Sequence, residues 1–191
     1  RKRSSAASDV YKRQPYSMHT LKRPNPNHAP GYAKRYFDYS GDQVDLLEAL
    51  KESKDTLIEF FKAIPSEKEN HRYAPEKWTI KGVLAHIIDT ERIFCGRAII
   101  AARHDEVNSP GYDDDAYAKY NNEENRSLTQ MIEEFELMRR NTICLFSTFE
   151  DEHLDFVGQA SKAPITARSC AWLMVGHGMH HMAVIRDKYL Y

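Results

Sequence analysis

The sequence predicts an all-α protein, a four-helix bundle that follows an irregular N-terminal arm. Four separate segments of about 20 residues place apolar side chains at helical spacing. No segment alternates apolar and polar residues over the length of a strand. Helices of this length are about 30 Å long, the dimension of a four-helix bundle. The chain has 191 residues, 41% hydrophobic and 29% charged, enough for one domain with a buried core.

The first 41 residues do not share the helical pattern. Residues 1–14, RKRSSAASDVYKRQ, hold five basic side chains and one acidic one, as a nucleic-acid or targeting arm would. The string also resembles translated adapter sequence, and the chain does not begin with Met, so we expect 1–17 to be a non-native or disordered tail. Residues 18–41, rich in Pro, Asn, His, Tyr and Gly, predict an irregular arm that packs partly on the domain through its tyrosines and Phe37. No other basic cluster indicates a nucleic-acid partner.

We expect the first two helices at residues 42–63 and 80–103. The first ends before Pro65, because proline cannot continue a helix. Thr79 precedes the second, where a threonine side chain can accept hydrogen bonds from the first turn. The apolar stripe of the first helix comprises Val44, Leu47, Leu50, Leu57, Ile58 and Phe61.

The third helix is expected to start after residues 125–127, and the fourth near Thr166, running almost to the end of the chain. Together the four helices form one domain over residues 42–191. The acidic, tyrosine-rich connection 104–126 is either a functional loop or a simple surface crossover. The stripe of the third helix comprises Leu128, Met131, Ile132, Phe135, Met138, Thr142, Leu145, Phe146 and Phe149.

Arg139 interrupts the apolar stripe of the third helix. A guanidinium keeps its proton, and burying it unpaired is costly. Asp89 and Glu91 of the second helix are therefore its expected partners, with Glu134 as a local alternative. The other interpretation is that the long side chain reaches water along the helix edge.

The composition excludes several classes of protein. No apolar run of about 18 residues is present, so no membrane span is expected, and no segment has the pattern of a signal peptide. Cys95, Cys144 and Cys170 are widely spaced and form no CxxC motif. Such cysteines are typical of free thiols in a reducing cytoplasm.

A histidine pair on the fourth helix is the leading candidate site. His177 and His181 lie four residues apart, on one helix face, and His86 of the second helix can supply a third imidazole. The three would hold one metal ion with an open coordination position; otherwise they are core histidines bonded to neighbours. Gly176 and Gly178 indicate close packing or access to the site, or else a locally weak helix.

The catalytic residues are not identified by the sequence. Asp89 and Glu91 follow His86 on the second helix, and either carboxylate could orient a ligand or act as a base. Asp89 can equally be a solvent-facing charge. The pattern around His177 is not HExxH, because Gly178 stands in the position of the glutamate, so the zincin mechanism is not expected.

Three motifs, KWTIKGVLAHIIDTERIF, EEFELMRRNTICLF and AWLMVGHGMHHMAVIRDKYL, together resemble the DinB-like superfamily of metalloenzymes. The resemblance covers about residues 40–191 in the same order and spacing. It implies a four-helix bundle, commonly up-down-down-up, with a divalent metal ion held by His86, His177 and His181. Many relatives have Glu directly after the first histidine of the last helix, where this chain has Gly178.

The resemblance implies a metal-dependent enzyme, either a hydrolase or a low-molecular-weight-thiol S-transferase, acting on a small molecule. Three imidazoles leave positions open for water or a thiol. Zinc and nickel are the leading metals, with iron and manganese as further options. A homodimer is expected by analogy alone. The alternatives are a non-catalytic metal-binding stress or scaffold protein, and a metal-free bundle that acts through partner contacts.

Overall fold

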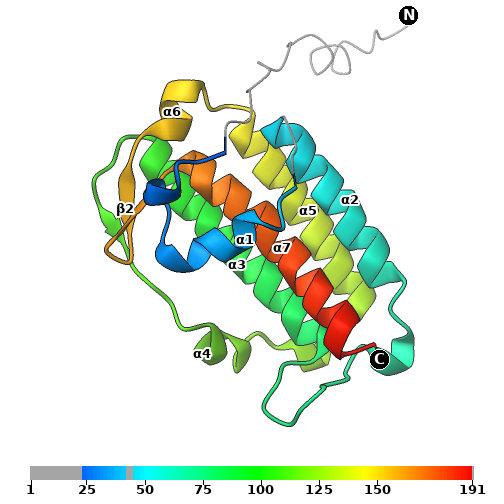
Figure 1. Ribbon diagram of the computed structural model, residues 1–191. Coiled ribbons are helices and arrows are strands. Elements are labelled where there is room, and N and C mark those ends of the chain that lie inside the picture. Colours follow the sequence, from blue (N-terminus) through cyan, green and yellow to red (C-terminus); the bar gives the residue numbers. More distant parts are fainter. Residues whose placement is uncertain (1–22, 42–44, 191) are drawn as a thin grey trace, which may run out of the picture.

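In the computed structural model, residues 23–41 and 45–190 are described, and within them four helices of 17 to 23 residues form the bundle (Figure 1). The all-α prediction is therefore confirmed. The predicted tail 1–17 lies outside the described residues, as do residues 42–44, where we placed the start of the first helix. The four helices are α2 (Leu46–Lys62), α3 (Ile80–Ala102), α5 (Leu128–Phe146) and α7 (Ala167–Lys188).

The helices are arranged as the up-down-down-up topology requires. α2 and α7 run in one direction, and α3 and α5 run in the other (Figure 1). The main contacts join α2 to α5 and α7, and α3 to the same two helices. Consecutive helices α2 and α3 therefore lie across a diagonal of the bundle, and α3 and α7, which carry the three histidines, are neighbours.

Polar side chains mark where the helices begin. Asp45, Thr79, Ser127 and Thr166 each accept a hydrogen bond from a backbone N–H in the first turn of the helix that follows. Capping of this kind satisfies N–H groups that have no partner inside the helix. The predicted cap at Thr79 is confirmed, with 2.8 Å between its hydroxyl oxygen and the backbone nitrogen of Gly82.

The described part of the arm folds into short turns on the surface of the bundle. These are η2 (Pro26–His28), η3 (Gly31–Ala33) and the single α-helical turn α1 (Lys34–Phe37). α1 packs on α7, and Tyr36 and Phe37 are buried. Tyr32 and Tyr39 remain about half exposed.

The long connection between α3 and α5 follows from the topology. Because these neighbouring helices run in the same direction, residues 103–127 must return along the bundle, a path of about 30 Å. β1 (Asn108–Ser109), α4 (Asp114–Ala118) and η5 (Glu123–Asn125) lie on this path. Near its end, Glu123 accepts a 2.6 Å hydrogen bond from the Thr79 hydroxyl and so ties the connection to the start of α3.

The described residues also form one small three-stranded sheet, a minor addition to the helical bundle. β1 pairs in parallel with β2 (Gly158–Ala160), and β2 pairs antiparallel with β3 (Ala163–Ile165). Strands of two or three residues are too short to show a periodic pattern in the sequence. The remaining short helices are η4 (Ser66–Lys68) and α6 (Asp151–Asp155).

The core between the helices has two apolar parts. One contains Phe146 and Trp172, and the other contains Phe61 and Phe135. Arg139 lies between Phe135 and Phe146 on α5, so a buried charge stands where the two parts meet.

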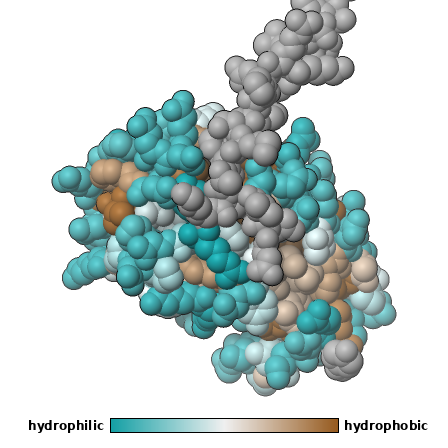
Figure 2. Space-filling model, turned by 45° about the horizontal axis from the view of Figure 1, so that its top comes forward, coloured by the Kyte–Doolittle hydropathy of each residue, from teal (hydrophilic) through white to brown (hydrophobic). Residues whose placement is uncertain are grey.

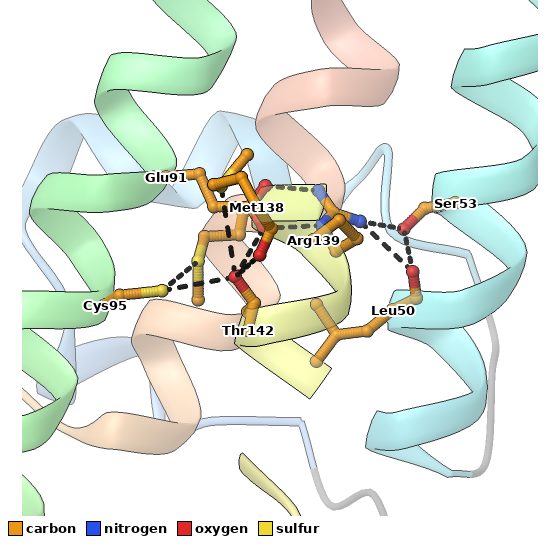
Figure 3. A network of polar contacts seen from close by, with 8 residues as sticks. Leu50, Ser53, Glu91, Cys95, Met138, Arg139 and Thr142 are labelled. Carbon is orange, nitrogen blue, oxygen red and sulfur yellow. Dashed lines mark hydrogen bonds and ion pairs between the residues drawn. The ribbon is translucent and has the colours of Figure 1, made fainter. Parts of the chain in front are cut away.

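Arg139 is fully buried and forms a double ion pair with Glu91 (Figure 3). Its Nε and Nη2 donate to the two carboxylate oxygens of Glu91, each over 2.6 Å. Nη1 donates to the hydroxyl of Ser53 and to the carbonyl of Leu50 on α2, and Thr142 donates to Glu91. Of the partners proposed from the sequence, Glu91 is therefore confirmed, and the solvent-facing alternative is wrong.

The face of the molecule in Figure 2 is mainly hydrophilic, with hydrophobic side chains confined to a few areas. Within residues 23–41 and 45–190, no helix is long and apolar enough to cross a membrane. The three cysteines are free thiols, as the sequence predicts.

Candidate metal centre

The bundle brings the three predicted histidines together. His177 and His181 lie on α7, and His86 faces them from α3. The Nε2 atom of His177 lies 2.9 Å from Nε2 of His86 and 3.0 Å from Nε2 of His181. One ligand atom from each ring fits within a group no more than 4.8 Å across.

This arrangement fits a divalent metal ion. Two nitrogens bound tetrahedrally at about 2.1 Å from one ion are about 3.4 Å apart, close to the separations found here. A neutral imidazole has one N–H and one lone pair. Nε2 of His177 faces two other Nε2 atoms, and its single lone pair cannot accept two good hydrogen bonds. One shared cation would let all three lone pairs point to the same place.

The surroundings keep the histidines in the form that binds metal. Burial lowers the pKa of His177 and His181 well below the usual range, and the neighbouring histidines lower both further. Burial also lowers the pKa of His86, although the charge of Asp114 opposes this. All three rings are therefore neutral near pH 7, and metal coordination requires neutral imidazoles.

Two glycines allow other elements to approach α7 beside the histidines. A Cβ atom on Gly176 would overlap the carbonyl oxygen of Tyr36 in α1. One on Gly178 would lie 2.7 Å from a methyl group of Leu57 in α2. The structure thus favours close packing as the reason for both glycines. As a result, the Tyr36 ring packs edge-on against His177, with 5.2 Å between the ring centroids.

A cavity of about 220 Å³ lies beside two of the histidines. Such a volume is below the usual range of about 300–1,000 Å³ for ligand pockets, so it suits a small molecule. Its walls come from the arm, α3, the long connection, the β2–β3 turn and α7. The lining residues are Tyr32, Arg35, Tyr36, His86, Thr90, Phe94, Arg97, Gly111, Tyr112, Asp114, Ser161, Leu173 and His177.

The structure does not bring Asp89 or Glu91 to this cavity. Four residues of α3 line the cavity: His86, Thr90, Phe94 and Arg97. The last three follow His86 by four, eight and eleven positions, so all four lie on one face of the helix. Glu91 lies about 140° around the helix from His86 and is held by Arg139. Oδ1 of Asp89 lies 3.4 Å from Nη1 of Arg92, and Arg92 is exposed to solvent. A position close to His86 in the sequence therefore did not identify the carboxylate that lies at the site.

Asp114 is the carboxylate that sequence reasoning missed. Its Oδ1 lies 3.9 Å from Nδ1 of His86, and its side chain is 52% exposed. Tyr112, from the same connection, shares a 3.0 Å hydrogen bond with Thr90 of α3. Burial raises the pKa of Tyr112 well above its usual range. The acidic, tyrosine-rich composition of residues 104–126 was the available signal, and the connection does line the cavity.

Comparisons with known proteins agree with the fold. A family model described as the DinB superfamily matches residues 49–185. No curated protein matches the sequence. Among solved structures, the chain is similar to YfiT from Bacillus subtilis, with 16% identity, a TM-score of 0.64, and coverage of 87% of this chain and 90% of that one. YfiT is described as "a probable metal-dependent hydrolase with an unusual four-helix bundle topology".

Proposed function

This chain belongs to the DinB superfamily, and on that premise we propose that it is a metal-dependent enzyme, with His86, His177 and His181 as ligands of one divalent ion. The observation that carries the proposal is the convergence of three histidine Nε2 atoms on one place in the bundle, where His86 and His177 also line a cavity. A structural role alone would not need three imidazoles with their Nε2 atoms facing one another.

The chemistry proposed for this site is the activation of water or of a low-molecular-weight thiol. A divalent ion held by imidazoles lowers the pKa of a water or thiol bound to it, which gives a nucleophile near pH 7. Zinc and nickel are the proposed metals, because imidazole ligands suit both. The description of YfiT supports the reaction with water. The thiol reaction and a homodimer rest on the family resemblance, and a cytoplasmic location rests on the three free cysteines.

Residues of the chain have separate roles in this proposal. Asp114 is a positioning residue, because its carboxylate lies on the Nδ1 side of His86. A carboxylate there favours the tautomer with the proton on Nδ1, which leaves the lone pair of Nε2 free for the ion. Tyr112 stays protonated and can donate a hydrogen bond toward a substrate in the cavity. Tyr36 covers His177 and excludes water from that side.

Elemental analysis of the full chain, purified without an affinity tag, tests the metal. We expect close to one equivalent of a divalent metal, lost in His177→Ala. His180→Ala is the matched control, because His180 lies on the same helix but outside the three-histidine group. Absence of metal from the wild type, or equal loss in both variants, would contradict the proposal and favour a metal-free bundle.

Turnover measurements then test the enzyme. Panels of esters and amides probe the reaction with water, and electrophiles offered together with a small thiol probe the transferase reaction. We expect activity in one panel that disappears in His177→Ala and persists in His180→Ala. A metal-loaded protein inactive in both panels would instead support a non-catalytic metal-binding protein.

A further inference from the structure

Arg97 is a buried cation in the wall of the cavity, and among the described residues it has no carboxylate partner. In the described part of the chain three arginines are buried: Arg97, Arg139 and Arg168. Arg139 pairs with Glu91, and Arg168 pairs with Asp155 over 2.6 Å. No described carboxylate lies within 4.0 Å of the Arg97 guanidinium, although only 4% of this residue is exposed.

The donors of Arg97 are only partly used. Nη2 donates to the carbonyl oxygen of Pro110 over 2.9 Å, but the buried Nε has no hydrogen-bond partner among the described residues. Buried donors normally have partners, and buried charges normally have counter-ions. A buried Nε donor without a partner, on a cation without a carboxylate among the described residues, therefore indicates a group that a ligand would supply.

The surroundings hold this cation in place at the cavity. Its guanidinium carbon lies 5.0 Å from the ring centroid of Phe94 and 5.7 Å from that of Tyr112. Aromatic faces attract a cation without using its N–H donors. A second cation, Arg35, lines the same cavity and donates a hydrogen bond to the Tyr36 hydroxyl over 2.7 Å. Asp114, at the His86 side, is the only acidic residue among the described lining residues.

Arg97 and the histidines stand at different places along the cavity. His86 and Arg97 are eleven residues apart on one face of α3, or about 16 Å along the helix axis. Helical side chains incline toward the N-terminus, so the long Arg97 side chain leans toward His86. A small molecule can thus contact Arg97 at one end and the histidine group at the other.

We propose that the cavity takes a small anionic substrate whose oxyanion group, a carboxylate or a phosphate, accepts hydrogen bonds from Arg97 while its reacting end faces the histidines. This proposal extends the proposed function, and it depends on that function only for the reacting end of the substrate. Guanidinium binds both oxyanions through parallel N–H donors, and the Arg97 side chain lines the cavity. Arg97 is therefore assigned as a substrate-binding residue.

Titration of the full chain with simple anions tests the assignment. Propionate and inorganic phosphate are the two anionic probes, and propionamide is the uncharged counterpart of propionate; binding is followed by NMR chemical shifts. We expect at least one anion to bind and propionamide not to bind. Arg97→Gln should weaken anion binding at least about tenfold, the usual effect of losing a hydrogen bond to a charged group. Arg92→Gln, an exposed position on the same helix, is the matched control and should change nothing.

Metal-free and metal-loaded protein are titrated in parallel, so that this proposal and the metal proposal can fail separately. Anion binding that survives metal removal and depends on Arg97 supports the oxyanion site even if the chain proves inactive. Binding that needs the metal and ignores Arg97→Gln overturns it, as does the absence of binding by either anion.

A stability measurement gives a second readout. Because Arg97→Gln strands no carboxylate among the described residues, it should leave the melting temperature unchanged or raise it. A fall of several degrees would show that Arg97 is structural and would count against the proposal. If Arg97→Gln does not fold, Arg97→Lys keeps the charge but loses the paired donors, and its anion affinity should still fall.

Discussion

The ion pair between Arg139 and Glu91 is the interaction on which a single substitution should act most strongly. Both side chains are almost fully buried, and every donor group of Arg139 has a partner. Arg139→Met would leave the Glu91 carboxylate buried without its counter-ion. We expect a loss of about 3–5 kcal/mol in the free energy of unfolding, measured by urea denaturation.

The control for this prediction is the double variant Arg139→Met with Glu91→Leu. Replacing both members of a buried pair by apolar residues is often nearly neutral, because no charge remains to be stranded. The double variant should therefore be more stable than Arg139→Met alone. If Arg139→Met costs less than about 0.5 kcal/mol, the pair contributes nothing beyond an ordinary surface contact.

The three cysteines should differ in reactivity because they differ in burial. Burial raises the pKa of the Cys95 thiol to about 11, and it raises that of the fully buried Cys170 further. At pH 7.5 only about one Cys95 in 3,000 is then the reactive thiolate. Cys144 is exposed. Iodoacetamide at pH 7.5, followed by mass spectrometry, should label Cys144 first. Labelling of Cys95 at an equal rate would show that its environment opens readily.

At the scale of the elements, contact between α1 and α7 depends on a glycine. Gly176→Ala would push a methyl group into the Tyr36 carbonyl, and backbone can yield only by moving the whole turn. We expect a loss of about 1–3 kcal/mol, the usual cost of overpacking, measured by thermal unfolding. Displacement of α1 would also uncover His177, so the exchange of the His177 ring protons with water should become faster.

Two other glycines calibrate this prediction. At Gly178 the added methyl meets only the end of the Leu57 side chain, which can rotate, so Gly178→Ala should cost less than Gly176→Ala. At Gly96, in the middle of α3, nothing lies within 4 Å of the added atom. Gly96→Ala should therefore stabilise the protein by up to about 1 kcal/mol through helix propensity. Equal effects at all three positions would contradict the packing explanation.

Across the whole molecule, sequence prediction succeeded where local patterns carry the information. Helical periodicity located the four long helices, and the side chains of Thr79 and Thr166 marked where two of them begin. Four-residue spacing on one helix placed His177 beside His181. A buried charge must find a counter-ion, and this rule led to Glu91 as the partner of Arg139.

Sequence prediction failed where segments that are distant in the sequence meet in the fold. Asp114 reaches His86 because the connection between two parallel helices has to run back along the bundle, which no local pattern reports. β1 pairs with β2 through residues about 50 positions apart. Arg97 drew no attention, since a basic residue on a helix is usually solvent-exposed, and its burial depends on Tyr112 and Pro110 of the same connection.

A bound ion should stabilise the whole bundle, because its ligands come from two helices. His86 of α3 and His177 of α7 meet only in the folded state, so metal binds the native protein in preference to the unfolded chain. At 100 times the dissociation constant, a ligand of this kind adds about 2.7 kcal/mol. For a chain of this size that corresponds to a rise in melting temperature of roughly 5–10 °C when zinc is added to chelator-treated protein. The rise should vanish in His86→Ala and His177→Ala and remain in His180→Ala. A similar rise in all variants would place the zinc on surface groups and would remove the three histidines as the centre of the molecule's chemistry.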